Sequence, residues 1–114
     1  MKKLTILFLF CCLNFFETFS QDFQWAYKTR EVSTIYGANI WSVVTDSQGN
    51  VYGTGGFGGT FDFDDSQNDN LLTPVTTISD GFVVKLDKYK NFQWVKQIKS
   101  LGNGRGRSII LDQN

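Results

Sequence analysis

The sequence predicts an all-β protein whose strands form an antiparallel, four-stranded unit. Three observations support this fold class. Beyond residue 20, no stretch spaces its apolar residues with a helical period, whereas several stretches alternate with the period of two that strands have. Aromatic residues make up 16% of the chain and proline occurs once, a composition typical of pleated sheets joined by glycine turns. Finally, Phe23-Gln24-Trp25 recurs unchanged as Phe92-Gln93-Trp94.

The repeat continues downstream of each tripeptide. Ser42-Val43-Val44-Thr45-Asp46 follows the first copy, and Ser108-Ile109-Ile110-Leu111-Asp112 follows the second with the same order of small, apolar and acidic residues. The tripeptides are offset by 69 positions and the downstream segments by 66, which indicates a three-residue difference in loop length. Because a repeat of this length rarely buries its own apolar surfaces, we expect it to stack on neighbouring repeats.

The first twenty residues have the features of a secretory signal peptide. Lys2 and Lys3 precede a thirteen-residue apolar run, 4–16, and Thr18 and Ser20 are the small residues of a cleavage site after Ser20. The run is shorter than the roughly 18 residues of a membrane-spanning helix, although a retained signal anchor is the alternative. We therefore expect residues 1–20 to be removed and the remainder to be secreted or on the cell surface, without a membrane span.

The expected mature chain, residues 21–114, has neither cysteine nor histidine. Cys11 and Cys12 both lie in the signal segment, and Phe10 before Cys11 does not suit a lipid-attachment site. Disulfide bonds are therefore excluded, as are the commonest general base and the commonest zinc ligand. Nine Lys or Arg against ten Asp or Glu leave a net charge near −1, which gives no electrostatic basis for binding nucleic acid.

The first two predicted strands form a hairpin. Residues 40–46 alternate, with one face formed by Trp41, Val43 and Thr45 and the other by Ser42, Val44 and Asp46. Residues 46–50 have turn chemistry, and residues 51–57 form the second strand. Three glycines in that strand, Gly53, Gly55 and Gly56, indicate either close approach of another backbone or a bulge.

Two further strands follow a long polar loop. Residues 60–63 briefly extend the second strand, and residues 64–79 are expected to be a surface loop. The third strand, 81–87, places Phe82, Val84 and Leu86 on one face and Val83 and Lys85 on the other. The fourth strand, 92–98, places Phe92, Trp94 and Ile98 on one face and Val95 on the other. A glycine-rich loop, 99–106, then leads to a strand at 107–112 that is equivalent to the first.

The four strands of residues 40–98 form one complete antiparallel unit. A lone strand of the fourth type, 22–28, precedes the unit, and a lone strand of the first type, 107–112, follows it. Four-stranded antiparallel sheets stacked around an axis are the blades of a β-propeller. A two-sheet sandwich is the alternative, but its strands do not recur as a four-strand unit. We therefore expect one blade with parts of two neighbours, an incomplete propeller.

The order of short motifs resembles the bacterial β-propeller repeats often called SBBP repeats, which occur in secreted and surface proteins. The similarity covers nearly the whole mature chain and rests on residues 42–52, Thr54-Gly55, residues 59–63, residues 80–87 and Trp94. Gly53 and the long 64–79 loop depart from the family's pattern. The resemblance implies that the strand at 22–28 closes the ring by completing the last blade.

Four acids are candidate calcium ligands, since carboxylate oxygens suit that ion: Asp62, Asp64, Asp65 and Asp69. Their order does not match a twelve-residue calcium loop, so we favour a solvated loop whose charges protect a sheet edge. A glycosidase pair would need two facing carboxylates about 5–10 Å apart, which four acids in one loop do not indicate. We therefore predict no catalytic, metal or cofactor-binding residues.

Two further features suggest binding. Residues 102–107, Gly-Asn-Gly-Arg-Gly-Arg, resemble a phosphate loop in composition, but a strand and not a helix is predicted to follow, so we interpret them as a connection between blades with Arg side chains at the rim. Trp25 and Trp94 occupy equivalent positions and are expected to pack between blades. Trp41 aligns with Arg107 and is the aromatic residue we predict as a binding contact.

The sequence thus predicts a non-enzymatic repeat module of an exported protein, serving as a scaffold or interaction surface. Its expected partners are further blades, other copies of itself, or an extracellular protein or glycan. The alternative is part of a secreted carbohydrate-binding protein or hydrolase whose active residues lie outside this chain. If the chain is part of a larger propeller, the repeat predicts Gly-Asn and a new strand directly after Asn114, and the isolated mature chain should self-associate or fold only partly.

Overall fold

The computed structural model describes residues 25–112. The predicted signal peptide, and Phe23 and Gln24 of the first tripeptide, lie outside the described residues. The described part of the chain consists of strands and loops, and it includes no helix that could cross a membrane.

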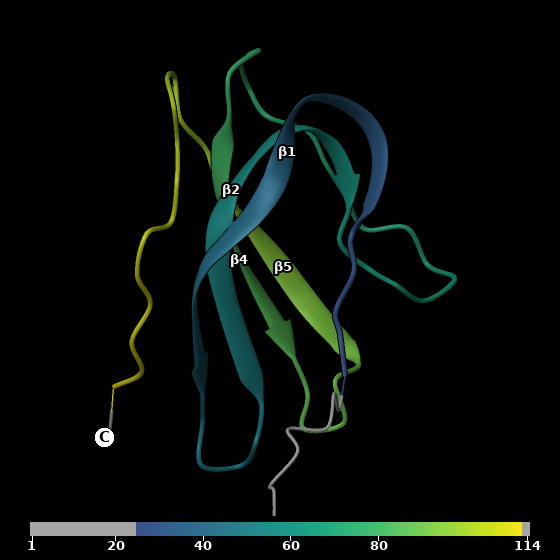
Figure 1. The fold of residues 1–114 in the computed structure, drawn as a ribbon, viewed down its shortest axis with the longest axis vertical. Helices are drawn as coiled ribbons and strands as arrows, with labels where there is room; N and C mark the ends of the chain where they lie inside the picture. The colour runs from purple at the N-terminus through teal and green to yellow at the C-terminus, as the bar shows by residue number, and fades with distance from the viewer. Residues whose placement is uncertain (1–24, 113–114) are drawn as a thin grey trace, which may run out of the picture.

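Within the described residues, five strands form a single open sheet (Figure 1). They are β1 (Arg30–Thr45), β2 (Val51–Asp62), β3 (Leu71–Leu72), β4 (Asp80–Leu86) and β5 (Phe92–Ile98). The order across the sheet is β1-β2-β4-β5 with every neighbouring pair antiparallel, and the short β3 pairs with the end of β2. The prediction of an all-β chain with an antiparallel sheet is therefore confirmed.

The strand β1 is longer than the predicted strand at 40–46. Its first ten residues pair with the second half of β2, from Gly56 to Asp62, through three irregularities of register. Each irregularity adds a residue to β1, so apolar and polar side chains do not alternate there with a period of two. The extension of β2 to Asp62 agrees with the prediction for residues 60–63, although these residues lie between β1 and β3 and not at an edge.

Two predicted strands are wrong in the part that the structure describes. Residues 25–29, from the predicted strand at 22–28, form no strand, and residues 107–112 form none either. A strand needs a ladder of backbone hydrogen bonds to a neighbour. Both segments instead lie against the faces of the sheet, so their backbones do not pair along an edge.

Two bulges also change which face a side chain occupies. Trp41 is the extra residue between Ile40, opposite Gly55, and Ser42, opposite Thr54. It therefore does not share a face with Val43, contrary to the prediction. Gln93 is the extra residue in β5, with the result that Phe92 packs on the core together with Val95, whereas Trp94 contacts Tyr52 on the opposite face at 6.3 Å between ring centroids.

The core lies on one face of the sheet, which we call the core face. It is built around three phenylalanine rings in mutual contact, Phe57, Phe63 and Phe82, with centroids 4.7 to 6.2 Å apart. Phe82, Val84 and Leu86 of β4 are all buried, as their alternation predicted. Tyr27 from the N-terminal segment packs against this core, and its hydroxyl donates a hydrogen bond to the carbonyl of Phe63.

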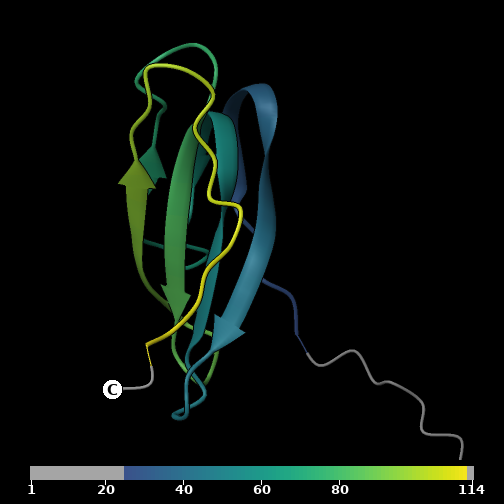
Figure 2. The same cartoon turned by 90° about the vertical axis from the view of Figure 1, so that its left-hand side faces the viewer.

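The opposite face is crossed by residues 103–112, which we call the C-terminal segment (Figure 2, yellow). The amide of Gly106 donates to the carbonyl of Gly55 at 2.9 Å. A methyl group on Gly106 would lie 1.9 Å from the Thr54 hydroxyl, and one on Gly56 would lie 3.3 Å from the Arg105 side chain. The close approach indicated by the glycines of β2 is therefore present, and so is the bulge beside Gly55.

Candidate functional site

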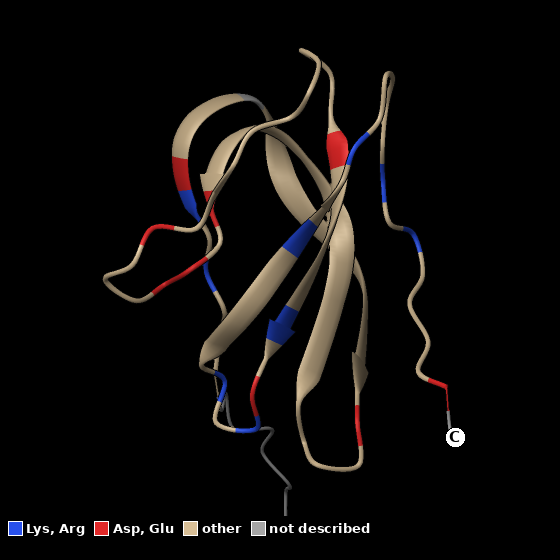
Figure 3. Ribbon diagram, turned by 180° about the vertical axis from the view of Figure 1, so that it is seen from behind, with Lys and Arg blue, Asp and Glu red and all other residues tan. Residues whose placement is uncertain are grey.

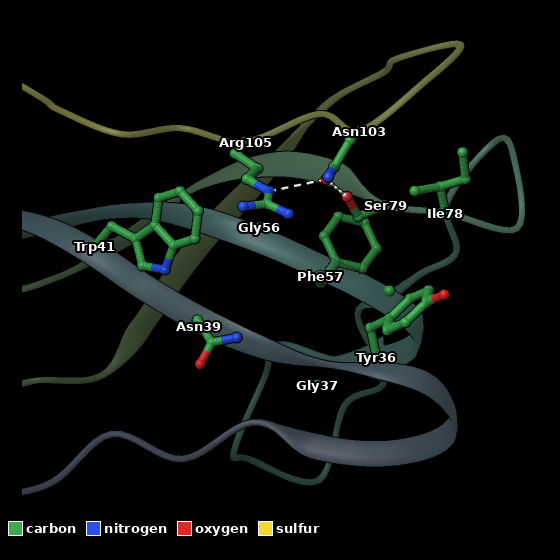
Figure 4. Close-up of a pocket in the computed structure, with 11 residues that line it drawn as sticks. Tyr36, Gly37, Asn39, Trp41, Gly56, Phe57, Ile78, Ser79, Asn103 and Arg105 are labelled. Carbon is green, nitrogen blue, oxygen red and sulfur yellow. Dashed lines mark hydrogen bonds between the residues drawn. The ribbon is translucent and has the colours of Figure 1, made fainter.

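An open cleft of about 420 Å³ lies between the middle of β1 and the C-terminal segment (Figure 4). Its volume is within the range of roughly 300–1,000 Å³ that small-molecule sites occupy. The side chains that give it its chemical character are aromatic, amide and guanidinium groups, together with one aliphatic side chain: Tyr36, Trp41, Asn39, Asn103, Arg105 and Ile78. Trp41, the aromatic residue predicted as a binding contact, therefore lies in the cleft.

The bulge in β1 is what directs Trp41 into the cleft. Because Trp41 is an extra residue opposite Gly55 and Thr54, its side chain leaves the face of Val43 and meets the C-terminal segment. The guanidinium carbons of Arg105 and Arg107 lie 5.1 Å and 5.5 Å from the centroid of a Trp41 ring, within cation–π range. The indole nevertheless stays 42% exposed, so part of its surface is accessible from solvent.

A short hydrogen-bond chain holds Arg105 in place. The Ser79 hydroxyl donates to Oδ1 of Asn103 at 2.6 Å, and Nε of Arg105 donates to the same oxygen at 2.8 Å (Figure 4, dashed lines). Backbone bonds fix the segment on both sides, since the amide of Gly104 donates to Ser79 at 2.9 Å and that of Gly106 to Gly55 at 2.9 Å.

Gly58 shapes the other end of the cleft. A methyl group added there would lie 2.7 Å from the Ile78 carbonyl and 2.8 Å from Cβ of Tyr36. Only a glycine allows these two residues to close on β2 at this point. Tyr36 itself is 60% exposed, and its ring borders the opening.

The glycine-rich residues 102–107 do not form a phosphate loop. The amides of Gly104 and Gly106 donate to protein carbonyls, and the amide of Gly102 donates to the Ser100 hydroxyl at 3.1 Å. Those amides are therefore not free to surround an anion. Arg105 and Arg107 are exposed and lie over Trp41, and their place at the rim of a ring stays a prediction.

The four acids proposed as calcium ligands have different surroundings. Asp65 and Asp69 are exposed, but Asp62 and Asp64 are buried, so the interpretation of a wholly solvated loop is wrong for these two. Asp62 accepts hydrogen bonds from Arg30 at 2.8 Å and from the amides of Asp64 and Asn70 at 3.1 and 2.9 Å. Across residues 25–112, no three acidic side chains gather in a way that would hold a metal ion.

These interactions set the ionisation of the groups around the loop. Burial by itself would raise the pKa of Asp62, but the hydrogen bonds from Asn70, Arg30 and Asp64 together hold it below its usual range. Burial raises the pKa of Tyr27, and the charges of Asp65, Asp64 and Asp62 raise it further. Asp62 and Asp64 therefore organise the loop after β2.

The other two tryptophans do not occupy equivalent places. Trp94 lies on a strand beside Tyr52, whereas Trp25 lies outside any strand, with the Lys90 ammonium 5.2 Å from its ring centroid. The sequence analysis also missed Tyr36 and Asn39, which belong to no motif, and it considered Asn103 only as part of the glycine-rich residues 102–107. The bulge that brings their strands and loops together depends on tertiary pairing, and the irregular alternation before Ile40 is the one sequence signal of it.

No family model matches the chain, and neither a curated protein nor a solved structure does.

Proposed function

We propose that the chain is a repeat module of an exported β-propeller of the SBBP type, a non-enzymatic scaffold that works by stacking on further blades or further copies of itself. The observation that carries the proposal is the position of the second copy of the repeated motif. Ile109 of the second copy lies beside Ser42 of the first, and its amide donates to the Ser42 hydroxyl at 3.3 Å. Equivalent first strands of successive blades are neighbours in a propeller.

The sheet also has an uncovered apolar strip. Val43 and Ile40 of β1 are 53% and 45% exposed. Both belong to the core face, because Val43 is opposite Gly53, whose added Cβ would contact Ile40 and Val84. Burying this strip against a second sheet would be favourable by roughly 25 cal/mol for each Å² removed from water. A stacking partner is thus expected at β1.

The buried acids support a scaffold more than an enzyme. Asp80 accepts hydrogen bonds from the amides of Val75 and Ser100 and from the Gln97 side chain, at 3.0, 2.9 and 2.6 Å. It joins three segments of the chain in this way. Asp62 does the same for the loop after β2, so both carboxylates are engaged in holding the fold together.

Sedimentation equilibrium of the mature chain, residues 21–114, tests the proposal. We expect its average mass to rise with concentration, and Val43→Lys to reduce that rise, because a charge would be placed in the stacking surface. Val75→Lys is the matched control, since Val75 is similarly exposed, at 48%, but lies in the loop before β4. A concentration-independent monomer with a sharp, cooperative melt would contradict stacking and would indicate a self-sufficient small domain.

A further inference from the structure

We infer that the cleft beside Trp41 binds a short anionic saccharide, one whose sugar rings carry carboxylates. This goes beyond the stacking function, because the described residues of a single chain form the whole cleft. Loss of stacking would leave the site intact, because the residues that line the cleft all belong to one chain.

The aromatic residues supply the surface for a sugar ring. Trp41 and Tyr36 border the cleft at different points and are 42% and 60% exposed. The C–H faces of a sugar ring are apolar while its edges carry hydroxyl groups, so an exposed aromatic ring can pack on one face without taking the hydroxyls out of water. The Asn39 amide, also in the cleft, can both donate to and accept from such hydroxyls.

The charge of the cleft selects an anion. Arg105 is the charged side chain among the lining residues, and Arg107 lies over the same indole, so two guanidinium groups repel each other there. Within the described residues, neither arginine forms an ion pair, since the salt bridges found there both belong to Arg30. A ligand carboxylate would relieve this repulsion and could bind a guanidinium through two parallel hydrogen bonds.

The acidic loop after β2 is kept away from this charge. Figure 3 shows the acidic loop after β2 and the basic positions of the C-terminal segment on opposite sides of the sheet. The nearest buried acid along the chain is Asp80, which follows the cleft residue Ser79. Its oxygens already accept the three hydrogen bonds described above.

The guanidinium is also pre-positioned. Its Nε is fixed by Asn103, whose own Oδ1 is fixed by Ser79, while the remaining guanidinium nitrogens make no hydrogen bond to another described residue. Holding the arginine before the ligand arrives reduces the entropy lost on binding. An acidic peptide would also meet the charge, but peptides that bind beside an edge strand use a row of backbone groups, whereas the polar groups here are separate side chains. We therefore favour the saccharide.

Isothermal titration of the mature chain with trigalacturonate tests the inference. Binding is expected with a dissociation constant of the order of 1 mM or lower, weakening as salt is added. A neutral galactose trisaccharide is the ligand control and should bind at least several-fold more weakly. In a two-dimensional NMR spectrum, the indole N–H signal that is lost in Trp41→Phe should shift during the titration more than those of the other tryptophans.

Arg105→Gln removes the charge but keeps a donor for Asn103, and it should lower the affinity roughly tenfold or more. Lys88→Gln is the matched control, because it removes the same charge from an exposed turn residue at the other end of the sheet, and the affinity should not change. Three results would overturn the inference: equal affinity for the charged and neutral trisaccharides, an equal loss of affinity in the two variants, or no binding of trigalacturonate. Hexaglutamate binding through Trp41 in the absence of trigalacturonate binding would overturn it too, in favour of an acidic peptide.

Discussion

Asp46 and Asp87 build two hairpin turns in the same way. One carboxylate oxygen of each aspartate accepts hydrogen bonds from two backbone amides, those of the second and fourth residues after it. The other oxygen accepts a hydrogen bond from the side-chain amide of that fourth residue, which is an asparagine in both turns. All of these distances lie between 2.8 and 3.0 Å. The residue before that asparagine has a positive φ, 86° at Gly49 and 74° at Lys90. The left-handed conformation is natural for glycine but costs an ordinary residue about 1–2 kcal/mol.

Exchanging the residues at these two positions should therefore have opposite effects. We expect Gly49→Ala to lower the free energy of unfolding by about 1–2 kcal/mol, because a Cβ at this φ is strained and would lie 3.3 Å from Cβ of Lys88. Lys90→Gly should raise the free energy of unfolding by about 0.5 kcal/mol, because the relief of backbone strain exceeds the cost of glycine's greater conformational entropy in the unfolded chain. Urea denaturation measures both. If Lys90→Gly destabilises the protein as much as Gly49→Ala does, the positive φ described at position 90 would be contradicted.

Asp62 should make stability depend on pH. Its folded pKa lies below the ordinary value of 3.8, so the native state favours the charged form and gains stability above that value. This stability is lost as the pH falls through the lowered folded pKa, so the melting temperature should drop between about pH 5 and pH 3. In Asp62→Asn the melting temperature should fall less over this pH range. Hydrogen bonds from Asn50 also lower the pKa of Asp46, so some of the drop remains in the variant. An unchanged pH profile in Asp62→Asn would contradict the role given to this carboxylate.

At the scale of elements, the docking of the C-terminal segment depends on glycine. Gly106→Ala would place a methyl group 1.9 Å from the Thr54 hydroxyl, so the segment should separate from the sheet. Trypsin should then cleave after Arg105 and Arg107 several-fold faster, because cleavage follows the population of the open state. Gly102→Ala is the matched control, since nothing lies within 4 Å of a methyl group there. Equal cleavage rates in the two variants would show that the segment is not held as described.

The sequence predicted the regular elements well and the irregular ones poorly. The burial of Phe82, Val84 and Leu86 followed from their alternation, and turn chemistry located the hairpin bends. Alternation does not predict bulges, however, because an extra residue changes the face of every side chain up to the next irregularity. Trp41 was therefore assigned to the wrong face, and its role as a binding contact stays a prediction although it lines the cleft. The cleft around it needed the long-range pairing of β1 with β2 and could not be predicted from local pattern.

The predicted strand at 107–112 shows the same limit for the repeat. Its residues match 42–46 in type, but strand structure requires a partner for the backbone as well as a suitable sequence. The described segment lies beside Ser42 without a ladder of its own. The repeat thus predicted a strand at 107–112 from residue type alone and did not predict the secondary structure that the segment has.

At the scale of the whole molecule, stacking of the propeller kind joins the core face of one copy to the opposite face of the next. The core face has the uncovered strip at Ile40 and Val43, and the opposite face carries the C-terminal segment. Successive blades join one kind of face to the other, a heterologous contact that can close into a ring, whereas a simple two-fold dimer joins like faces. The two arrangements differ in which residues meet Val43.

The most direct measurement places a photo-crosslinking side chain at that position, as Val43→p-benzoylphenylalanine, in the mature chain. Mass spectrometry of the cross-linked dimer then identifies the residues reached on the second chain. We expect cross-links from position 43 to the opposite face of the other copy, in residues 103–112 or near Trp94. Cross-links confined to residues around position 43 itself, or none between chains, would contradict a repeat module that stacks as propeller blades do.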